Sequence, residues 1–180
     1  FQTVSIASTT GFASSDFNLW PDFSRYVLLL LMFVGGCSGS TAGGMKVSRF
    51  VILLKVTWAE LRRTIHPRLV YSIKMGGRNV PPVVVGNVTR FFYLYMIVFS
   101  TLTLLISLTG LSMLDSMGII AACMSSVGPA FGIVGPTATY ADVSTFGRLV
   151  VIAAMILGRL EIFTLLIIMR PDFWRVKRNW

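Results

Sequence analysis

The chain has 180 residues, of which 54% are hydrophobic and only 13% are charged, and its formal net charge is +9. Soluble globular domains carry about 25% charged residues, so this composition excludes an ordinary soluble globule and a disordered chain. Apolar stretches lie near 24–61, 88–111 and 146–169, and the last two are long enough for a helix to cross a bilayer. The sequence therefore predicts an all-α integral membrane protein and no binding of nucleic acid.

The ends and the cysteines add two expectations. The chain begins at Phe1 without a basic leader, which predicts that it has no signal peptide and is a fragment of a longer protein. The two cysteines, Cys37 and Cys123, lie in Gly-rich or apolar surroundings. We interpret them as thiols that neither bind a metal nor form a disulfide.

Two short segments on the predicted outer side have similar sequences. Residues 6–13, IASTTGFA, align without a gap with 123–130, CMSSVGPA. Each follows an apolar stretch too short to span a bilayer and precedes a longer span. Non-helical backbone at membrane depth survives only where it is enclosed or lines a water-filled path, and there its carbonyls can replace the hydration shell of a cation. We therefore predict two re-entrant pore loops, with ordinary glycine-containing turns as the alternative.

The first span is interrupted by the stretch GGCSGSTAGG at 35–44. Each glycine costs a helix about 1 kcal/mol relative to alanine, so the stretch predicts a loop inside the membrane. An interrupted helix in a transporter usually marks the permeation path. The alternative is a close helix–helix contact through Gly35, Gly39 and Gly43, which follow one another at a four-residue spacing.

The same stretch has a weak resemblance to an enzyme motif. Gly36, Ser38 and Gly39 match the serine motif of rhomboid intramembrane proteases. That chemistry needs a histidine beside the serine, and the only histidine, His66, lies in the following basic loop. An enzyme is therefore not predicted.

Positive charge is concentrated between the first and second spans and after the third. Because basic loops remain cytoplasmic, the chain should begin outside, cross inward near 24–61, return near 88–111, stay external over 112–145 and end in the cytoplasm. Nucleic-acid binding by the basic loop is the weaker alternative, because the loop lies between two spans. The basic residues of the first connection are Lys46, Arg49, Lys55, Arg62, Arg63, Arg68, Lys74, Arg78 and Arg90.

Arg159 lies within the third apolar region, where a charged side chain needs a partner. It lies as far beyond Gly128 as Ala42, in the glycine-rich stretch, lies beyond Gly11. If the two pore loops belong to repeats, Arg159 and the stretch share one depth in the membrane. We predict that Arg159 hydrogen-bonds carbonyls of the 35–44 loop and holds it across a pore as a gate. A purely structural arginine near a helix end is the alternative.

Six stretches together are typical of one family of membrane proteins: STTGF at 8–12, GGCSGSTAGGMK at 35–46, IHPR at 65–68, KMGG at 74–77, SVGP at 126–129 and GRLEIF at 158–163. With them the chain resembles the TrkH/KtrB family of potassium transporter subunits. The resemblance implies potassium-channel-like helix–pore-loop–helix repeats, four to a polypeptide. This chain would hold the pore loop and broken transmembrane helix of the third repeat (1–61), a cytoplasmic basic loop (62–86) and the fourth repeat with a basic tail (87–180).

The resemblance also implies a function, potassium uptake through a carbonyl-lined selectivity filter gated by the Gly-rich loop. The implied filter residues are Thr9, Thr10, Gly11, Ser126, Val127 and Gly128. The implied gating residues are Gly35, Gly36, Gly39, Ser40, Thr41, Gly43 and Gly44, with Arg159 beneath them. Potassium would be the substrate, and neither a catalytic residue nor a cofactor is implied.

The implied location is the bacterial inner membrane, where the chain would be multi-pass and in contact with lipid. The implied partners are the missing repeats of the same polypeptide, a second copy in a homodimer, and a cytoplasmic nucleotide-binding subunit that docks on the basic loop. A non-conducting membrane scaffold that packs through small-residue helix interfaces is the alternative. Selectivity for potassium over sodium and coupling to protons stay open.

Overall fold

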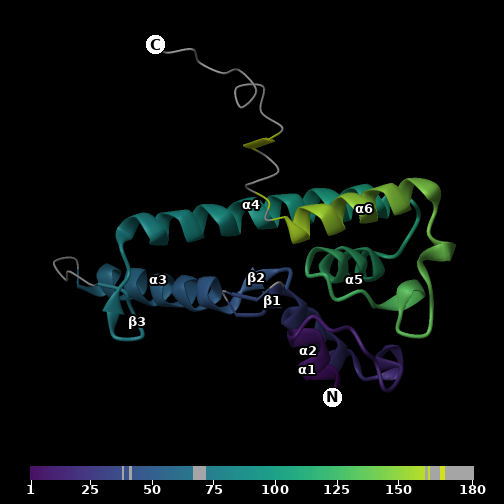
Figure 1. Cartoon of the computed structure of the whole chain (residues 1–180), viewed down its shortest axis with the longest axis horizontal. Helices are drawn as coiled ribbons and strands as arrows, with labels where there is room; N and C mark the ends of the chain where they lie inside the picture. The colour runs from purple at the N-terminus through teal and green to yellow at the C-terminus, as the bar shows by residue number, and fades with distance from the viewer. Residues whose placement is uncertain (38, 41, 67–71, 161, 163–166, 169–180) are drawn as a thin grey trace, which may run out of the picture.

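The computed structural model describes residues 1–37, 39–40, 42–66, 72–160, 162 and 167–168, and these are mostly helical, as predicted. Figure 1 shows two long helices side by side, α4 (Pro82–Ser107) and α6 (Thr145–Arg159), with the shorter α5 (Met113–Met124) packed beneath them. The side chains of α5 form the centre of the core. Ile119 and Met124 have no exposed surface.

Helix α4 corresponds to the predicted second span, with different ends. It begins at Pro82, earlier than the predicted 88, because a proline at the first helical position needs no hydrogen-bond partner for its nitrogen. Its 26 residues extend about 39 Å, more than the hydrocarbon thickness of about 30 Å. Among the residues that the structure describes, α4 is the one helix long and apolar enough to cross a membrane.

Both helices around the second predicted pore loop begin with a serine cap. The Ser112 hydroxyl accepts a hydrogen bond from the Asp115 amide at 3.1 Å at the start of α5, and the Ser144 hydroxyl accepts one from the Gly147 amide at 3.1 Å at the start of α6. Such caps satisfy amides that have no partner in the first turn of a helix.

The predicted interruption of the first span is present. Helix α2 (Asp22–Phe33) ends before it and α3 (Val47–Ile65) begins after it. Between them the strands β1 (Val34–Gly35) and β2 (Met45–Lys46) pair in parallel, so the chain leaves in the direction in which it entered and the stretch between forms a side loop. The alternative of a continuous helix with Gly35, Gly39 and Gly43 on one face is therefore wrong.

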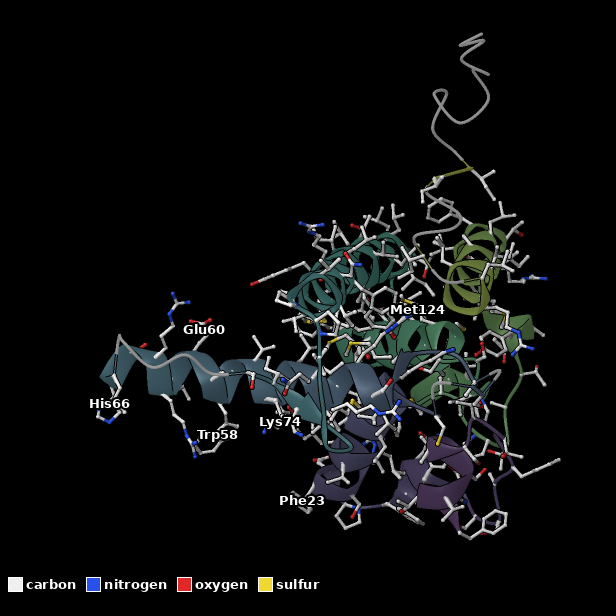
Figure 2. All side chains as sticks on the ribbon, turned by 60° about the vertical axis from the view of Figure 1, so that its left-hand side comes forward. Phe23, Trp58, Glu60, His66, Lys74 and Met124 are labelled. Carbon is white, nitrogen blue, oxygen red and sulfur yellow. The ribbon has the colours of Figure 1, made fainter. Side chains whose placement is uncertain are left out.

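Helix α3 lies along α4 and carries the chain away from the rest of the molecule (Figure 1). Near its start the Arg49 guanidinium lies 4.2 Å from the centroid of the Phe91 ring, a cation–π contact between the two helices. Its far end projects from the bundle with Trp58, Glu60 and His66 along it (Figure 2). The helix runs to Ile65, beyond the boundary expected at 61.

The structure differs from the sequence expectation at two further places, the basic loop and the end of α6. The basic loop contains a hairpin of β3 (Lys74–Met75) and β4 (Arg78–Asn79), which was not predicted, and its turn residues Gly76 and Gly77 both have positive φ. Helix α6 ends at Arg159 because Leu160 leaves the helical conformation, with φ −89° and ψ 12°. Arg159 is thus the last residue of α6, but Ile162, Ile167 and Ile168 are again helical, so the predicted span to 169 stays a prediction. Residues 161, 163–166 and 169 lie outside the described residues.

Helix α6 meets the end of α5 through Gly158. A Cβ built at Gly158 would collide with the Met124 carbonyl oxygen and lie 2.7 Å from its carbonyl carbon. Gly158→Ala should therefore lower the free energy of unfolding by about 1–3 kcal/mol through overpacking. The measurement is the thermal midpoint of the purified, detergent-solubilised protein.

The matched control is Gly86→Ala on α4, where no described atom outside the local helix backbone lies within 4 Å of the added Cβ. There the higher helix propensity of alanine should leave the midpoint unchanged or raise it. Equal midpoints for the two variants would contradict close packing at Gly158.

Candidate functional site

Helices α1 (Gln2–Ala7) and α5 end in the same backbone conformation. Their C-caps, Ser8 and Ser125, have φ and ψ of −83° and −3° and of −85° and −6°. The next residues, Thr9 and Ser126, are left-handed, with φ of 56° and 58°. A β-branched residue in this region is unusual, and such strain persists mainly where function requires it.

In each turn two successive amides donate back to the helix with the same spacing, which is the Schellman arrangement. The bonds are Thr9 N to Ile6 O at 3.0 Å, Thr10 N to Ser5 O at 2.9 Å, Ser126 N to Cys123 O at 3.1 Å and Val127 N to Ala122 O at 2.9 Å. The bonds correspond one to one under the gapless alignment of the two segments. We call residues 8–11 the first turn and 125–128 the second turn.

The two turns also share a left-handed glycine and lie against each other. Gly11 has φ +76° and Gly128 has φ +101°, values that favour glycine. A Cβ built at Gly11 would collide with the Val127 carbonyl oxygen and lie 3.2 Å from Cδ of Pro129. The structure thus brings the two predicted filter segments together, backbone against backbone.

The glycine-rich stretch is attached to the second turn at the end of α5. The Gly44 amide donates to the Met124 carbonyl at 3.2 Å, and the Ser125 hydroxyl donates to the Met32 carbonyl at the end of α2. A Cβ built at Gly43 would lie 2.6 Å from the carbonyl carbon and oxygen of Ser125. Met124 itself lies where the helices meet (Figure 2).

The neck of the loop is equally tight. Gly35 is buried, and a Cβ there would collide with the Gly43 carbonyl oxygen. The Gly36 carbonyl accepts a hydrogen bond from the Val47 amide at 3.2 Å. Gly35, Gly36, Gly43 and Gly44 therefore lie together beside the second turn.

The middle of the loop is more open. The Ser40 amide donates to the Cys37 carbonyl at 2.9 Å, and the Ser40 hydroxyl accepts from the Ala42 amide at 3.1 Å. No described atom lies within 4 Å of a Cβ built at Gly39. Thr41, predicted to belong to the gate, and Ser38, of the protease-like motif, lie outside the described residues.

Arg159 shares a cavity with the second turn. The cavity has a volume of about 510 Å³, and Cys123, Ser126, Val127 and Gly128 line it together with Arg159. The end of α6 thus lies beside the space onto which the turn opens. The predicted hydrogen bond of Arg159 to the 35–44 loop stays a prediction.

Sequence reasoning did not single out two side chains that hold the turns from outside. The Asn18 amide forms a reciprocal pair with the Gly132 backbone, accepting from its amide at 3.0 Å and donating to its carbonyl at 3.3 Å. The Tyr140 hydroxyl donates to the Gly128 carbonyl at 2.6 Å. A local sequence signal exists only for Asn18. Its backbone amide donates to the Asp16 carboxylate at 2.9 Å in an Asx turn.

The Asn18 pair ties the segment after the first turn to the segment after the second, beside an edge-to-face contact of Phe17 and Phe131 with centroids 5.4 Å apart. Asn18→Ala should lower the free energy of unfolding by about 1–2 kcal/mol, since two hydrogen bonds are lost and their backbone partners stay partly buried. Thermal unfolding of the detergent-solubilised protein measures the change. Asn79→Ala, on the exposed strand β4, is the control, and an equal midpoint for both would show that the pair contributes nothing.

Comparison with known proteins identifies the family to which the chain is similar. Residues 1–175 match the family model described as TrkH, cation transport protein. The chain is 45% identical over 175 residues to the Trk system potassium uptake protein TrkH of Vibrio parahaemolyticus, and 41% and 35% identical to TrkH and TrkG of Escherichia coli K12. Each match covers 97% of this chain and 36% of the relative.

The fold matches as well. The crystal structure of the potassium transporter TrkH from Vibrio parahaemolyticus superposes with a TM-score of 0.87 at 45% identity, covering 97% of this chain and 37% of that one. The fold and the sequence both match the class of proteins described as cation transport proteins. The chain belongs to the TrkH family, and it spans about 36% of the length of these curated relatives.

Proposed function

We propose that this chain is the part of a potassium uptake protein that supplies two ion-coordinating segments and the gate beneath them. The observation that carries the proposal is the pair of turns with matching backbone conformation, in contact at Gly11 and Val127. Potassium is the proposed ion because the relatives are named potassium uptake proteins. The chain would contribute the third and fourth filter segments, and the rest of the polypeptide the other two.

The proposed chemistry is replacement of water by main-chain oxygens. In each turn residues 9 and 11, or 126 and 128, are left-handed, and the residue between them is not. This alternation allows successive carbonyls to face one side, where they can take the place of the hydration shell of a monovalent cation. The C-terminal ends of α1 and α5 add the negative end of a helix dipole beside the ion.

The proposed gate consists of the 35–44 loop and Arg159. Its support is the attachment of Gly43 and Gly44 to the end of α5, which puts the loop beside the second turn. Arg159 lines the same cavity as that turn, so its positive charge opposes the passage of a cation. Among the described residues of the loop, Gly39 has open space beside it, as expected of a segment that can move aside.

The placement of the whole protein is also proposed. Helix α4 would cross the bacterial inner membrane, with the turns outside and the basic loop in the cytoplasm, as the charge distribution favours. Helix α3 and the β3–β4 hairpin are linked where Lys55 Nζ donates to the Lys74 carbonyl at 2.5 Å. This basic end is the proposed docking surface for a cytoplasmic nucleotide-binding subunit, and a homodimer is the proposed assembly.

The test of the filter is potassium-dependent growth of an uptake-deficient bacterium that expresses the complete transporter polypeptide. Gly11→Ser and Gly128→Ser should each abolish rescue at low potassium, because a side chain at positive φ strains the turn and, at Gly11, collides with Val127. Gly110→Ser is the matched control, since Gly110 also has positive φ (+85°) but lies in the turn after α4. Growth with Gly11→Ser and Gly128→Ser like that of the parent would refute the proposed filter.

The test of the gate is ion flux in proteoliposomes under conditions that hold the parent closed. Arg159→Ala should raise potassium leak severalfold, because the charge in the cavity is lost. Arg148→Ala is the control: it removes a positive charge from the opposite end of α6, where Arg148 Nε donates to the Val143 carbonyl at 2.9 Å. Unchanged leak in Arg159→Ala, with protein abundance equal to the parent, would defeat the proposed gate.

A further inference from the structure

The segment between the second turn and α6 is folded back and held. The Ala130 amide donates to the Val134 carbonyl at 2.8 Å, and the Asn18 side chain forms two hydrogen bonds with the Gly132 backbone. A short 3-10 helix, η3 (Tyr140–Asp142), follows, and Val143 at its end is buried. Tyr140 therefore approaches the second turn from a fixed position.

The Tyr140 hydroxyl joins two parts of the site. It donates to the Gly128 carbonyl at 2.6 Å and lies 3.4 Å from Cys123 Sγ in the last turn of α5. A phenol has one proton, and the carbonyl can only accept, so that proton goes to Gly128 and the Cys123 thiol donates to the phenol oxygen. The result is a chain of two hydrogen bonds, from Cys123 on α5 to Tyr140 and from Tyr140 to Gly128 in the second turn. Each bond strengthens the other.

The phenol stays a donor at physiological pH. Burial raises the pKa of the Tyr140 hydroxyl well above its ordinary value, and the neighbouring Cys123 raises it further. The neutral form is therefore favoured, so the bond to Gly128 persists as pH varies around neutrality. It works as a constant brace and not as a pH switch.

The first turn is braced differently. There the Ser5 hydroxyl, on α1 itself, donates to the Phe12 carbonyl at 2.6 Å, one residue beyond Gly11. In the second turn the donor is Tyr140, from the segment between this turn and α6, and the acceptor is the carbonyl of Gly128 itself. The two turns thus share a backbone conformation but not the side chain that fixes it.

We propose that Tyr140 is a positioning residue of the second turn, and that its bond to the Gly128 carbonyl sets the preference of the ion path for potassium over sodium. The proposal rests on the proposed function. To replace the water of the smaller sodium ion, the oxygens of a filter must move closer together. A turn that is held by the bond from Tyr140 to the Gly128 carbonyl resists this inward movement. Without that bond the turn can contract around the smaller ion.

The experiment uses the complete transporter polypeptide, reconstituted in liposomes, and compares its permeability to potassium and to sodium. Tyr140→Phe keeps the ring and removes the donor, and it should lower the potassium-to-sodium ratio about fivefold, the size expected for loss of one hydrogen bond. Replacement by 4-aminophenylalanine, which restores an N–H donor at the same position, should return the ratio toward that of the parent. Tyr93→Phe, at a 64% exposed tyrosine on α4, is the control with an unchanged ratio.

The outcomes separate the two proposals. A parent that is selective for potassium, with an equal ratio in Tyr140→Phe, overturns the role of Tyr140 alone. A parent without potassium-selective flux overturns the proposed function and this role with it. If size-exclusion profiles show that Tyr140→Phe is not folded, Cys123→Ala, which removes the thiol behind the phenol, should lower the ratio about twofold to threefold by weakening the brace. No change in that variant also overturns the role.

Discussion

At the end of helix α5 the backbones of two other elements, the glycine-rich loop and α6, approach without side chains between them. The Met124 carbonyl receives the Gly44 amide on one side and has no room for a side chain at Gly158 on another, while Gly43 lies against the carbonyl of Ser125. Both Met124 and Ser125 have no exposed surface, so these contacts are buried, and an unpaired carbonyl there would be costly. The second turn, the glycine-rich loop and α6 all depend on this junction for their positions.

The two turns are alike locally and unlike in their surroundings. The second follows α5, the most buried of the described helices, and is fixed by Tyr140 from the segment between this turn and α6. The first turn follows the six-residue helix α1, and Thr10 in this turn is exposed in this part of the protein. A shared conformation in such different settings indicates that the short-range hydrogen bonds of the Schellman arrangement determine the turn. The surroundings determine only how firmly it is held.

Local chemistry explains how much of this could be predicted from the sequence. The two turns and the interrupted helix follow from Ser/Thr-x-Gly segments and from five glycines in ten residues, both of which act within a few positions. The partners of Asn18 and Ser125 lie about a hundred residues away, and nothing near either residue indicates which carbonyl it meets. The β3–β4 hairpin has a local signal, the pair Gly76-Gly77 at its turn. The end of α6 at Arg159 had none, because the apolar pattern continues past it.

The parallel pairing of β1 with β2 has a consequence for the loop that it encloses. The strands join the chain at 34–35 to the chain at 45–46, so the two ends of the loop are fastened together before α3 begins. A segment fastened at its base can be resized or refolded while the register of α2 and α3 is conserved, since neither helix transmits the change. The cost of closing such a segment rises only slowly with its length. A change of length in the middle of the loop, away from Gly43 and Gly44, should thus leave the register of α2 and α3 intact.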